Sequence, residues 1–252
     1  MSITSRRKWL IRGLGAAAGV SGLGITARLA ARHGLIPPDA ATLYGLGGTL
    51  TYASHRLITR HSLAREFPRS LISPSPFANP VEPPKEEFRR LQAGGFAAWR
   101  LEVGGMAARP ASFSLDDLRR MPSRSQITQL VCEEGWSYIA EWTGVPLAHI
   151  LDSVRTAPRA KFVVYSSADG IWWDSIDMAD ALHPQTLVTY AMNGSDLPVG
   201  FGGPLRMRVP RQLGYKSVKF INRLTITDNL SSFGKGLGSG GPEFGYAWYA
   251  GI

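Results

Sequence analysis

From Trp99 onward, the chain is divided into short apolar segments separated by glycine and proline, and this pattern restricts the possible folds more than any other feature of the sequence. Segments of about five residues in which apolar and polar side chains alternate are typical of half-buried strands. We predict strands over residues 99–103, 127–131, 161–165, 187–192, 205–209 and 220–226. Short helices are predicted over residues 115–121, 145–154 and 178–182. Strands interrupted by brief helices favour a mixed α+β sheet over a regular βαβ series.

Length and composition limit the domain organisation. The chain has 252 residues, which is room for one domain of ordinary size with a short appendage, and 44% of them are apolar, enough for a large core. No apolar run approaches the roughly 18 residues of a typical membrane span. The single cysteine excludes an intrachain disulfide. These features argue against a multidomain machine, a membrane channel and a disulfide-stapled scaffold.

Positive charge is concentrated at the N-terminus. Residues 1–31 contain no acid, and the rest of the chain carries 23 basic and 19 acidic residues. A nucleic-acid-binding protein is expected to carry a basic stripe on its folded body. This small excess gives little support for such a partner, and we expect none. The basic residues of the N-terminal segment are Arg6, Arg7, Lys8, Arg12 and Arg28.

The same N-terminal segment resembles an export signal. Arg6 and Arg7 precede Trp9 and two aliphatic residues, and a weakly hydrophobic, glycine-rich run follows. A basic head before a short apolar run is the layout of a secretory signal, and the paired arginines resemble the twin-arginine type. We therefore expect residues 1–31 to be a signal peptide that directs the protein to the periplasm. A basic amphipathic surface helix or a plain membrane anchor is the alternative.

Residues 32–90 are predicted to form an N-terminal extension and linker before a folded domain of residues 91–252. Proline-rich stretches interrupt the extension. Residues 49–67 have helical spacing, with apolar side chains such as Leu50 and Leu57 on one side. Near the other end of the chain, the glycine-rich residues 234–241 are predicted to form a mobile surface loop.

Cys132 follows the predicted strand of residues 127–131 and precedes a polar turn that contains glycine. A thiol at the mouth of a strand can face a cavity, where its thiolate is a soft ligand for a metal. A lone cysteine is also commonly a small buried hydrophobic residue, so both interpretations stay open on this residue alone. An exported chain with one unpaired thiol nevertheless calls for an explanation.

Two motifs surround this cysteine, CEEGWS at residues 132–137 and WTGVPL at residues 142–147. They resemble the molybdopterin-binding domain of the sulfite-oxidase-like oxidoreductase family, and the resemblance covers about residues 99–226. It is closest to the family's branch of periplasmic methionine-sulfoxide reductase catalytic subunits and solitary-domain relatives. It implies a sulfite-oxidase-type α+β fold with a mixed sheet. Further matching segments follow in order at residues 160–163, 181–187, 193–194, 203–206 and 214–219.

The resemblance also implies a cofactor. In this family, molybdenum is held by one cysteine sulfur and by two dithiolene sulfurs of one pyranopterin, so Cys132 would be the metal ligand and the catalytic residue. The cofactor carries a phosphate, which suits arginine side chains and backbone N–H groups. The resemblance places cofactor contacts at Asn79, Ser167, Phe201, Arg206, Ser217, Val218 and Lys219.

Some of these positions have other interpretations. Arg206 and Arg208 alternate along one strand and share a face, which is also typical of a solvated surface. Residues 214–219 could form an anion-binding nest or only a charged turn. Relatives usually carry histidine or asparagine where this chain has Phe201. A phenyl ring cannot hydrogen-bond a pterin, so the pocket is reshaped or the cofactor is held more weakly.

The sequence therefore predicts an exported, monomeric molybdenum-cofactor enzyme that transfers an oxygen atom on a small sulfoxide-like or related substrate. The Arg-Asn-His string of sulfite oxidases is missing, which disfavours sulfite. The chain has no haem-attachment motif, so electrons would be exchanged with a separate haem protein or quinone-linked membrane subunit. The alternative is a non-catalytic periplasmic binding module that retains the scaffold without metal chemistry.

Overall fold

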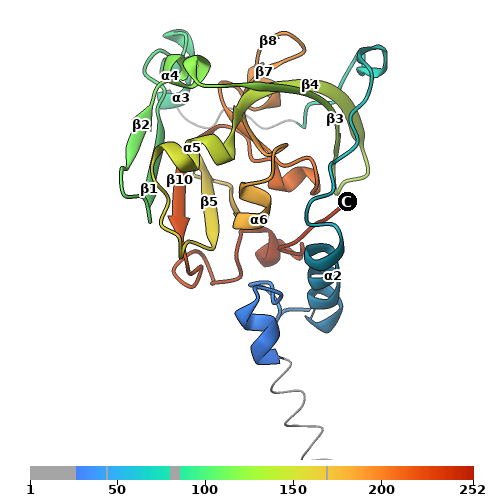
Figure 1. The fold of residues 1–252 in the computed structure, drawn as a ribbon. Helices are drawn as coiled ribbons and strands as arrows, with labels where there is room; N and C mark the ends of the chain where they lie inside the picture. The colour runs from blue at the N-terminus through green and yellow to red at the C-terminus, as the bar shows by residue number, and fades with distance from the viewer. Residues whose placement is uncertain (1–26, 44, 80–85, 169) are drawn as a thin grey trace, which may run out of the picture.

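The computed structural model describes residues 27–43, 45–79, 86–168 and 170–252. Most of the predicted signal at residues 1–31 therefore lies outside the described residues. Within them, the strands form two five-stranded sheets (Figure 1). The first sheet has the order β2 (Ala111–Phe113), β1 (Leu101–Gly105), β10 (Ile221–Thr227), β5 (Phe162–Ser167) and β6 (Trp173–Asp177). The second contains β3 (Arg124–Val131), β4 (Ser137–Pro146), β7 (Leu187–Met192) and β8 (Ser195–Asp196), and β9 (Arg206–Arg208) also pairs with β7.

Strand directions confirm the predicted mixed α+β class. β1 and β10 run parallel, whereas every other pair in the two sheets is antiparallel. Short helices connect the strands. They are α3 (Glu86–Ala93), α4 (Leu115–Arg120), α5 (Leu147–Ser153) and α6 (Met178–Ala181), with 3₁₀ turns η1 (Arg69–Leu71), η2 (Val199–Phe201), η3 (Gly214–Lys216) and η4 (Gly241–Phe244).

All six predicted strands have counterparts, but four observed strands were not predicted. The longest of these is β4, whose side chains are buried on both faces over much of its length, so apolar and polar residues do not alternate. At Gly144 the pairing of β4 with β7 shifts by one residue. A Cβ there would lie 2.2 Å from the Val188 carbonyl oxygen, so only glycine permits this close approach.

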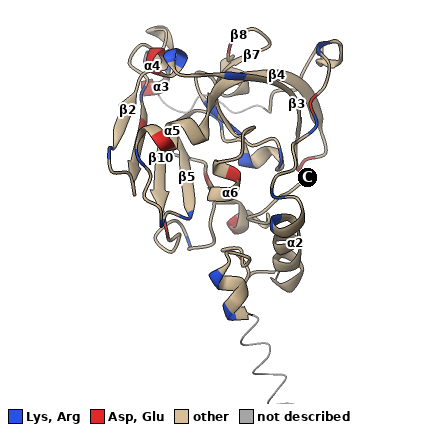
Figure 2. Ribbon diagram, viewed as in Figure 1, with Lys and Arg blue, Asp and Glu red and all other residues tan. Residues whose placement is uncertain are grey.

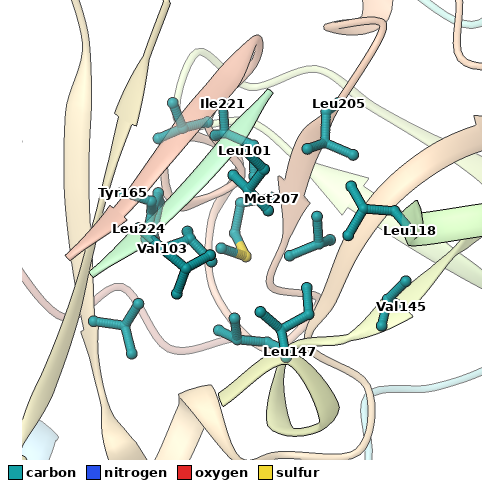
Figure 3. Packing of buried hydrophobic residues seen from close by; sticks show 14 of the residues in the cluster. Leu101, Val103, Leu118, Val145, Leu147, Tyr165, Leu205, Met207, Ile221 and Leu224 are labelled. Atoms are coloured by element: carbon teal, nitrogen blue, oxygen red, sulfur yellow. The ribbon is translucent and has the colours of Figure 1, made fainter. Parts of the chain in front are cut away.

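The main core lies between the two sheets (Figure 3). Leu101 and Leu224 from the first sheet meet Val145 and Met207 from the second, and Leu118 of α4 joins them. All five side chains are completely buried. The apolar contact between the sheets fixes their relative position, and this position brings the ends of β3, β5 and β9 together.

The segment before the sheets is held by ion pairs. α2 (Gly45–Ile58) buries Tyr52 and Arg56 against α6. The Arg56 guanidinium lies 2.7 Å from the Asp177 carboxylate and 2.6 Å from that of Asp180. The helix spans residues 45–58, so the extent predicted for it, residues 49–67, is wrong. The polar face is the buried one because two buried carboxylates require a cation.

Beyond α2 the chain runs along the second sheet. The Phe67 amide donates to the Ile127 carbonyl oxygen, and the Ser73 amide donates to that of Ile139. Residues 45–79 thus contact the sheets throughout, while the division into residues 32–90 and 91–252 stays a prediction. The glycine-rich residues 234–241 were predicted to form a surface loop, and this is wrong for residues 238–241, which are buried. The Gly238 carbonyl oxygen accepts a hydrogen bond from the Ser175 hydroxyl.

Candidate functional site

A cavity of about 290 Å³ lies where β3, β5 and β9 end. Its walls come from both sheets, from η2 and η3, and from residues 77–79. The structure brings all eight predicted site residues to this one cavity, although they span 140 positions of the chain from first to last. Their chemical roles stay predictions. They are Asn79, Cys132, Ser167, Phe201, Arg206, Ser217, Val218 and Lys219.

Cys132 is positioned by a tight turn at the end of β3. Its amide donates to the Trp136 carbonyl oxygen, and Gly135, with a φ of +92°, allows the turn to close. The thiol hydrogen-bonds the Glu133 carboxylate, with Sγ and Oε2 3.4 Å apart. Burial, together with the Glu133 and Glu134 carboxylates, raises the pKa of the Cys132 thiol to about 12. The free thiol is therefore protonated at neutral pH.

Two arginines of β9 flank the Trp142 ring, and one of them, Arg206, lines the cavity. The guanidinium groups of Arg206 and Arg208 are 5.3 and 5.4 Å from the centre of the Trp142 ring. Both side chains are almost completely buried, so the alternative of a solvated face is wrong. Arg206 donates to the carbonyl oxygens of Phe201 and Ser217, at 2.6 and 2.7 Å, and its Nε has no hydrogen-bond partner among the described residues.

Lys219 supplies a further cation to the cavity wall. Its ammonium group donates to the carbonyl oxygens of Asn79 and Gly200, at 2.8 and 2.7 Å. Gly202 has a φ of +103°, and a Cβ there would lie 2.8 Å from the Lys219 Cβ, so glycine is needed for this packing. Burial, and then the nearby Arg206, lower the pKa of Lys219 to about 8.

The loop that carries Ser217 is held in place by buried contacts with the protein interior. Lys216 is fully buried, and its ammonium nitrogen lies 2.5 Å from the Asp174 carboxylate. Tyr165 donates a hydrogen bond to the Lys216 carbonyl oxygen at 2.8 Å. The Ser217 hydroxyl accepts a hydrogen bond from the Val209 amide at 3.2 Å. The loop is therefore a packed element of the interior, and its backbone at residues 217–219 faces the cavity.

An aromatic wall was not anticipated from the sequence. Phe201 packs edge-on against Tyr138, with ring centres 5.7 Å apart, and Phe77 packs edge-on against Trp136 at 5.0 Å. Trp172, Tyr215 and Tyr246 complete the wall. These aromatic residues come from six separate segments, so no spacing in the sequence links them. Their abundance in the chain, 7 Trp, 8 Tyr and 10 Phe, was the only signal.

The charges of the cavity fit an anionic group. Arg206 and Lys219 line the cavity together with Glu133, and Arg208 is buried next to Arg206; none of the three cations forms an ion pair with any described residue. Burial, and then the proximity of Arg206, lower the pKa of Arg208 to about 9. Buried charges are normally paired, so three cations without a carboxylate are expected to accommodate a phosphate.

The donor set also fits a metal that brings ligands of its own. In the ranges that the structure describes, no three His, Cys, Asp or Glu side chains gather into a metal site. The cavity does contain one soft sulfur donor at Cys132. This arrangement suits a cofactor in which a pterin contributes the remaining sulfur ligands.

Comparisons with known proteins agree with the site. The family model described as "Oxidoreductase molybdopterin binding domain" matches residues 90–233. The chain is 37% identical to a putative protein-methionine-sulfoxide reductase subunit YedZ1 of Azospira oryzae over 77% of this chain and 70% of that protein. It is 35% identical to the protein-methionine-sulfoxide reductase catalytic subunit MsrP of Xanthomonas axonopodis over 52% of this chain and 46% of that protein.

A solved structure supports the fold. The sulfane dehydrogenase SoxCD from Paracoccus pantotrophus aligns with a TM-score of 0.51 and 22% identity, over 68% of this chain and 46% of that one. The chain thus spans under half the length of SoxCD and of the Xanthomonas reductase subunit. The family model and the first relative confirm the resemblance inferred from the motifs around Cys132. This chain belongs to the molybdopterin-binding oxidoreductases of the sulfite-oxidase-like type.

Proposed function

We propose that this protein is an exported molybdenum-cofactor enzyme that transfers an oxygen atom on a small sulfoxide-like substrate. The observation that carries the proposal is the meeting of the Cys132 thiol with unpaired cations in one cavity. The names of its relatives as methionine-sulfoxide reductase subunits support the substrate class. When bound, the molybdenum cofactor would supply a metal centre able to exchange an oxygen atom and an electron pair.

Cys132 would bind the metal through its sulfur. Because its pKa is about 12, the thiol is protonated before the metal arrives, and binding must release that proton. The Glu133 carboxylate already accepts the hydrogen bond of the thiol, at 3.4 Å between Sγ and Oε2. Glu133 is therefore placed to receive the proton at Oε2.

The phosphate end of the pterin would lie at the cations. Arg206 would offer its unpaired Nε, and Lys219 its charge. Ser217 and the Val218 backbone would contribute a hydroxyl and an amide from the fixed loop. Phe201 would act through its carbonyl oxygen, which orients Arg206, while its ring closes the wall. Asn79 and Ser167 line the same cavity and would complete the contacts.

The aromatic wall favours a neutral substrate. Trp136, Trp172 and Tyr246 give the cavity an apolar wall, and Arg206 and Lys219 would be occupied by the phosphate of the cofactor and so would not balance the charge of an anion such as sulfite. A neutral sulfoxide loses less hydration on entering such a site. The electrons would be exchanged with a separate haem or quinone-linked partner.

The experiment that tests this proposal is metal analysis of the protein exported from cofactor-competent cells. We expect about one molybdenum per chain, together with pterin fluorescence. Cys132→Ser should abolish turnover with reduced dyes and sulfoxides and change the electronic spectrum of the metal, whereas Ser137→Ala, in the same turn, should leave both unchanged. An unchanged spectrum in Cys132→Ser would reject the ligand assignment. Protein free of metal and pterin would favour the non-catalytic binding module.

The export route has its own test. The proposal rests on Arg6 and Arg7 in the sequence, because these residues lie outside the described ranges. Changing both arginines to lysine should leave folded precursor in the cytoplasm. Cell fractionation measures where the variant accumulates, and normal secretion of the variant would contradict the twin-arginine route.

A further inference from the structure

One face of α2 exposes large aliphatic side chains. Leu46, Leu50 and Leu57 are 75%, 57% and 70% exposed. Because they are four and seven residues apart, they share one side of the helix, and we call them the leucine stripe. No exposed side chain of α2 carries a charge, whereas a surface helix normally turns charged residues toward water. Within the described residues, this apolar face is uncovered.

The helix that carries the leucine stripe is firmly attached. Its opposite side buries Arg56, which pairs with Asp177 and Asp180 and stacks 4.7 Å from the ring centre of Tyr249. Tyr52 donates a hydrogen bond to Asp177 at 2.7 Å. A frayed helix would expose leucines by chance. The leucine stripe, in contrast, lies on a helix whose opposite face is bonded to the rest of the protein.

The surroundings of the leucine stripe are positively charged. Residues 27–65 contain a single acid, Asp39, which is buried and accepts a hydrogen bond from the Trp248 amide. Arg32, Arg60 and Arg65 are exposed. Figure 2 shows α2 and the short helix of residues 27–32 extending from one end of the molecule, below the sheets. The next acid, Glu66, is exposed but pairs with Arg124. An apolar stripe within a segment whose unpaired exposed charges are positive is complementary to an anionic lipid surface.

We propose that the leucine stripe docks on an anionic phospholipid bilayer, with α2 lying along the interface. The leucines would bury apolar surface below the headgroups, and Arg60 and Arg65 would be attracted to lipid phosphates. In the described ranges, no helix has the length and apolarity needed to cross a bilayer, so this contact is with the surface of the membrane. A second protein copy would meet the same cations and be repelled by them. The inference does not depend on the proposed function.

The test is cosedimentation of the full chain with two kinds of vesicle, phosphatidylcholine alone and phosphatidylcholine mixed with phosphatidylglycerol. We expect binding to the mixed vesicles, and weaker binding to the neutral ones and at high salt. The triple variant Leu46→Ser, Leu50→Ser and Leu57→Ser should bind the mixed vesicles at least about tenfold more weakly. Leu182→Ser is the matched control, since Leu182 is an isolated leucine that is 55% exposed.

Two outcomes would overturn the proposal. Equal vesicle binding by the wild type and the triple variant would place any membrane contact elsewhere in the chain. A dimer of the wild type that the triple variant loses, without vesicle binding by either, would assign the leucine stripe to a second copy. Thermal unfolding shows whether the triple variant is folded. Because the substituted side chains are exposed, the midpoint of its thermal unfolding should match that of the wild type. Substitution of Arg60 and Arg65 by glutamine should abolish the preference for anionic vesicles while leaving the weak neutral binding.

Discussion

Two groups of buried charges in this molecule differ in how they are balanced. The anchor cluster joins Arg56 to Asp177 and Asp180, and these carboxylates raise the pKa of Arg56 above its usual value despite burial. The cavity cluster, comprising Arg206, Arg208 and Lys219, has no carboxylate partner among the described residues, and burial lowers the pKa of all three. A balanced cluster stabilises a fold by itself, whereas an unbalanced one is completed by a ligand.

The largest expected effect tests the balanced cluster. Arg56→Met should lower the free energy of unfolding by about 3–5 kcal/mol, because it leaves Asp177 buried without a cation and Asp180 with only Arg211, 3.6 Å away. Urea denaturation measures this loss. The triple variant Arg56→Met, Asp177→Asn and Asp180→Asn should recover part of it. A loss below about 1 kcal/mol, as is usual for exposed pairs, would show that the anchor cluster contributes little.

The second prediction concerns the unbalanced cluster. Arg206→Met should cost only about 1–2 kcal/mol of stability, because it removes hydrogen bonds to two carbonyl oxygens but relieves repulsion between cations. The same change should lower the molybdenum content of purified protein about tenfold, which corresponds to about 1.4 kcal/mol of cofactor binding. Metal analysis and urea denaturation of the same preparation measure the two effects. Full metal content in Arg206→Met would remove the cavity cluster from cofactor binding.

The third prediction uses the titration of Lys219. Its pKa is about 8 in the folded protein, below the ordinary value of 10.5, so the unfolded chain binds more protons between these values. Lys219 should therefore make the cofactor-free protein more stable as the pH rises from 8 toward 10.5. Sulfate, whose charge is constant, should instead bind about fivefold more weakly above pH 8, where Lys219 loses its charge. Thermal shifts with and without sulfate measure both trends, and Lys219→Met should flatten both.

The smallest effect comes from a pair that belongs to neither cluster. Glu86 and Arg90 form an exposed ion pair four residues apart on α3. Arg90→Ala should change the free energy of unfolding by about 0.3–0.5 kcal/mol, since exposed helix pairs contribute little. Urea denaturation again provides the measurement. A cost similar to that of Arg56→Met would mean that burial does not distinguish the two kinds of pair.

The difference between the clusters also explains what the sequence could predict. Residues of the cavity lie in motifs whose order along the chain resembles a known family, so Cys132, Arg206 and Lys219 could be assigned to one site before any geometry was known. Local signals were equally reliable. Ser114 caps α4 by accepting a hydrogen bond from the Asp117 amide, and a serine just before a helix with acids in its first turn is a typical N-cap pattern.

The anchor cluster could not be predicted, because its members are joined only by the tertiary fold. Arg56 is separated from Asp177 by 121 positions, and nothing in the local spacing of α2 indicates that its polar side is buried. The apolar periodicity of the helix therefore gave no information about which of its faces is buried. β4 escaped prediction for a related reason, since a strand buried on both faces does not show the alternation by which strands are found.

The separation of Arg56 from its partners also sets an order of events during synthesis. The ribosome completes α2 well before it adds Asp177 and Asp180, so the helix lacks these partners until the chain has grown 121 positions beyond Arg56. The amides of Phe67 and Ser73 likewise await carbonyl oxygens of β3 and β4. Residues 45–73 can therefore dock only after β3, β4 and α6 have been made, which makes this segment a candidate for a chaperone to cover while the chain is still growing.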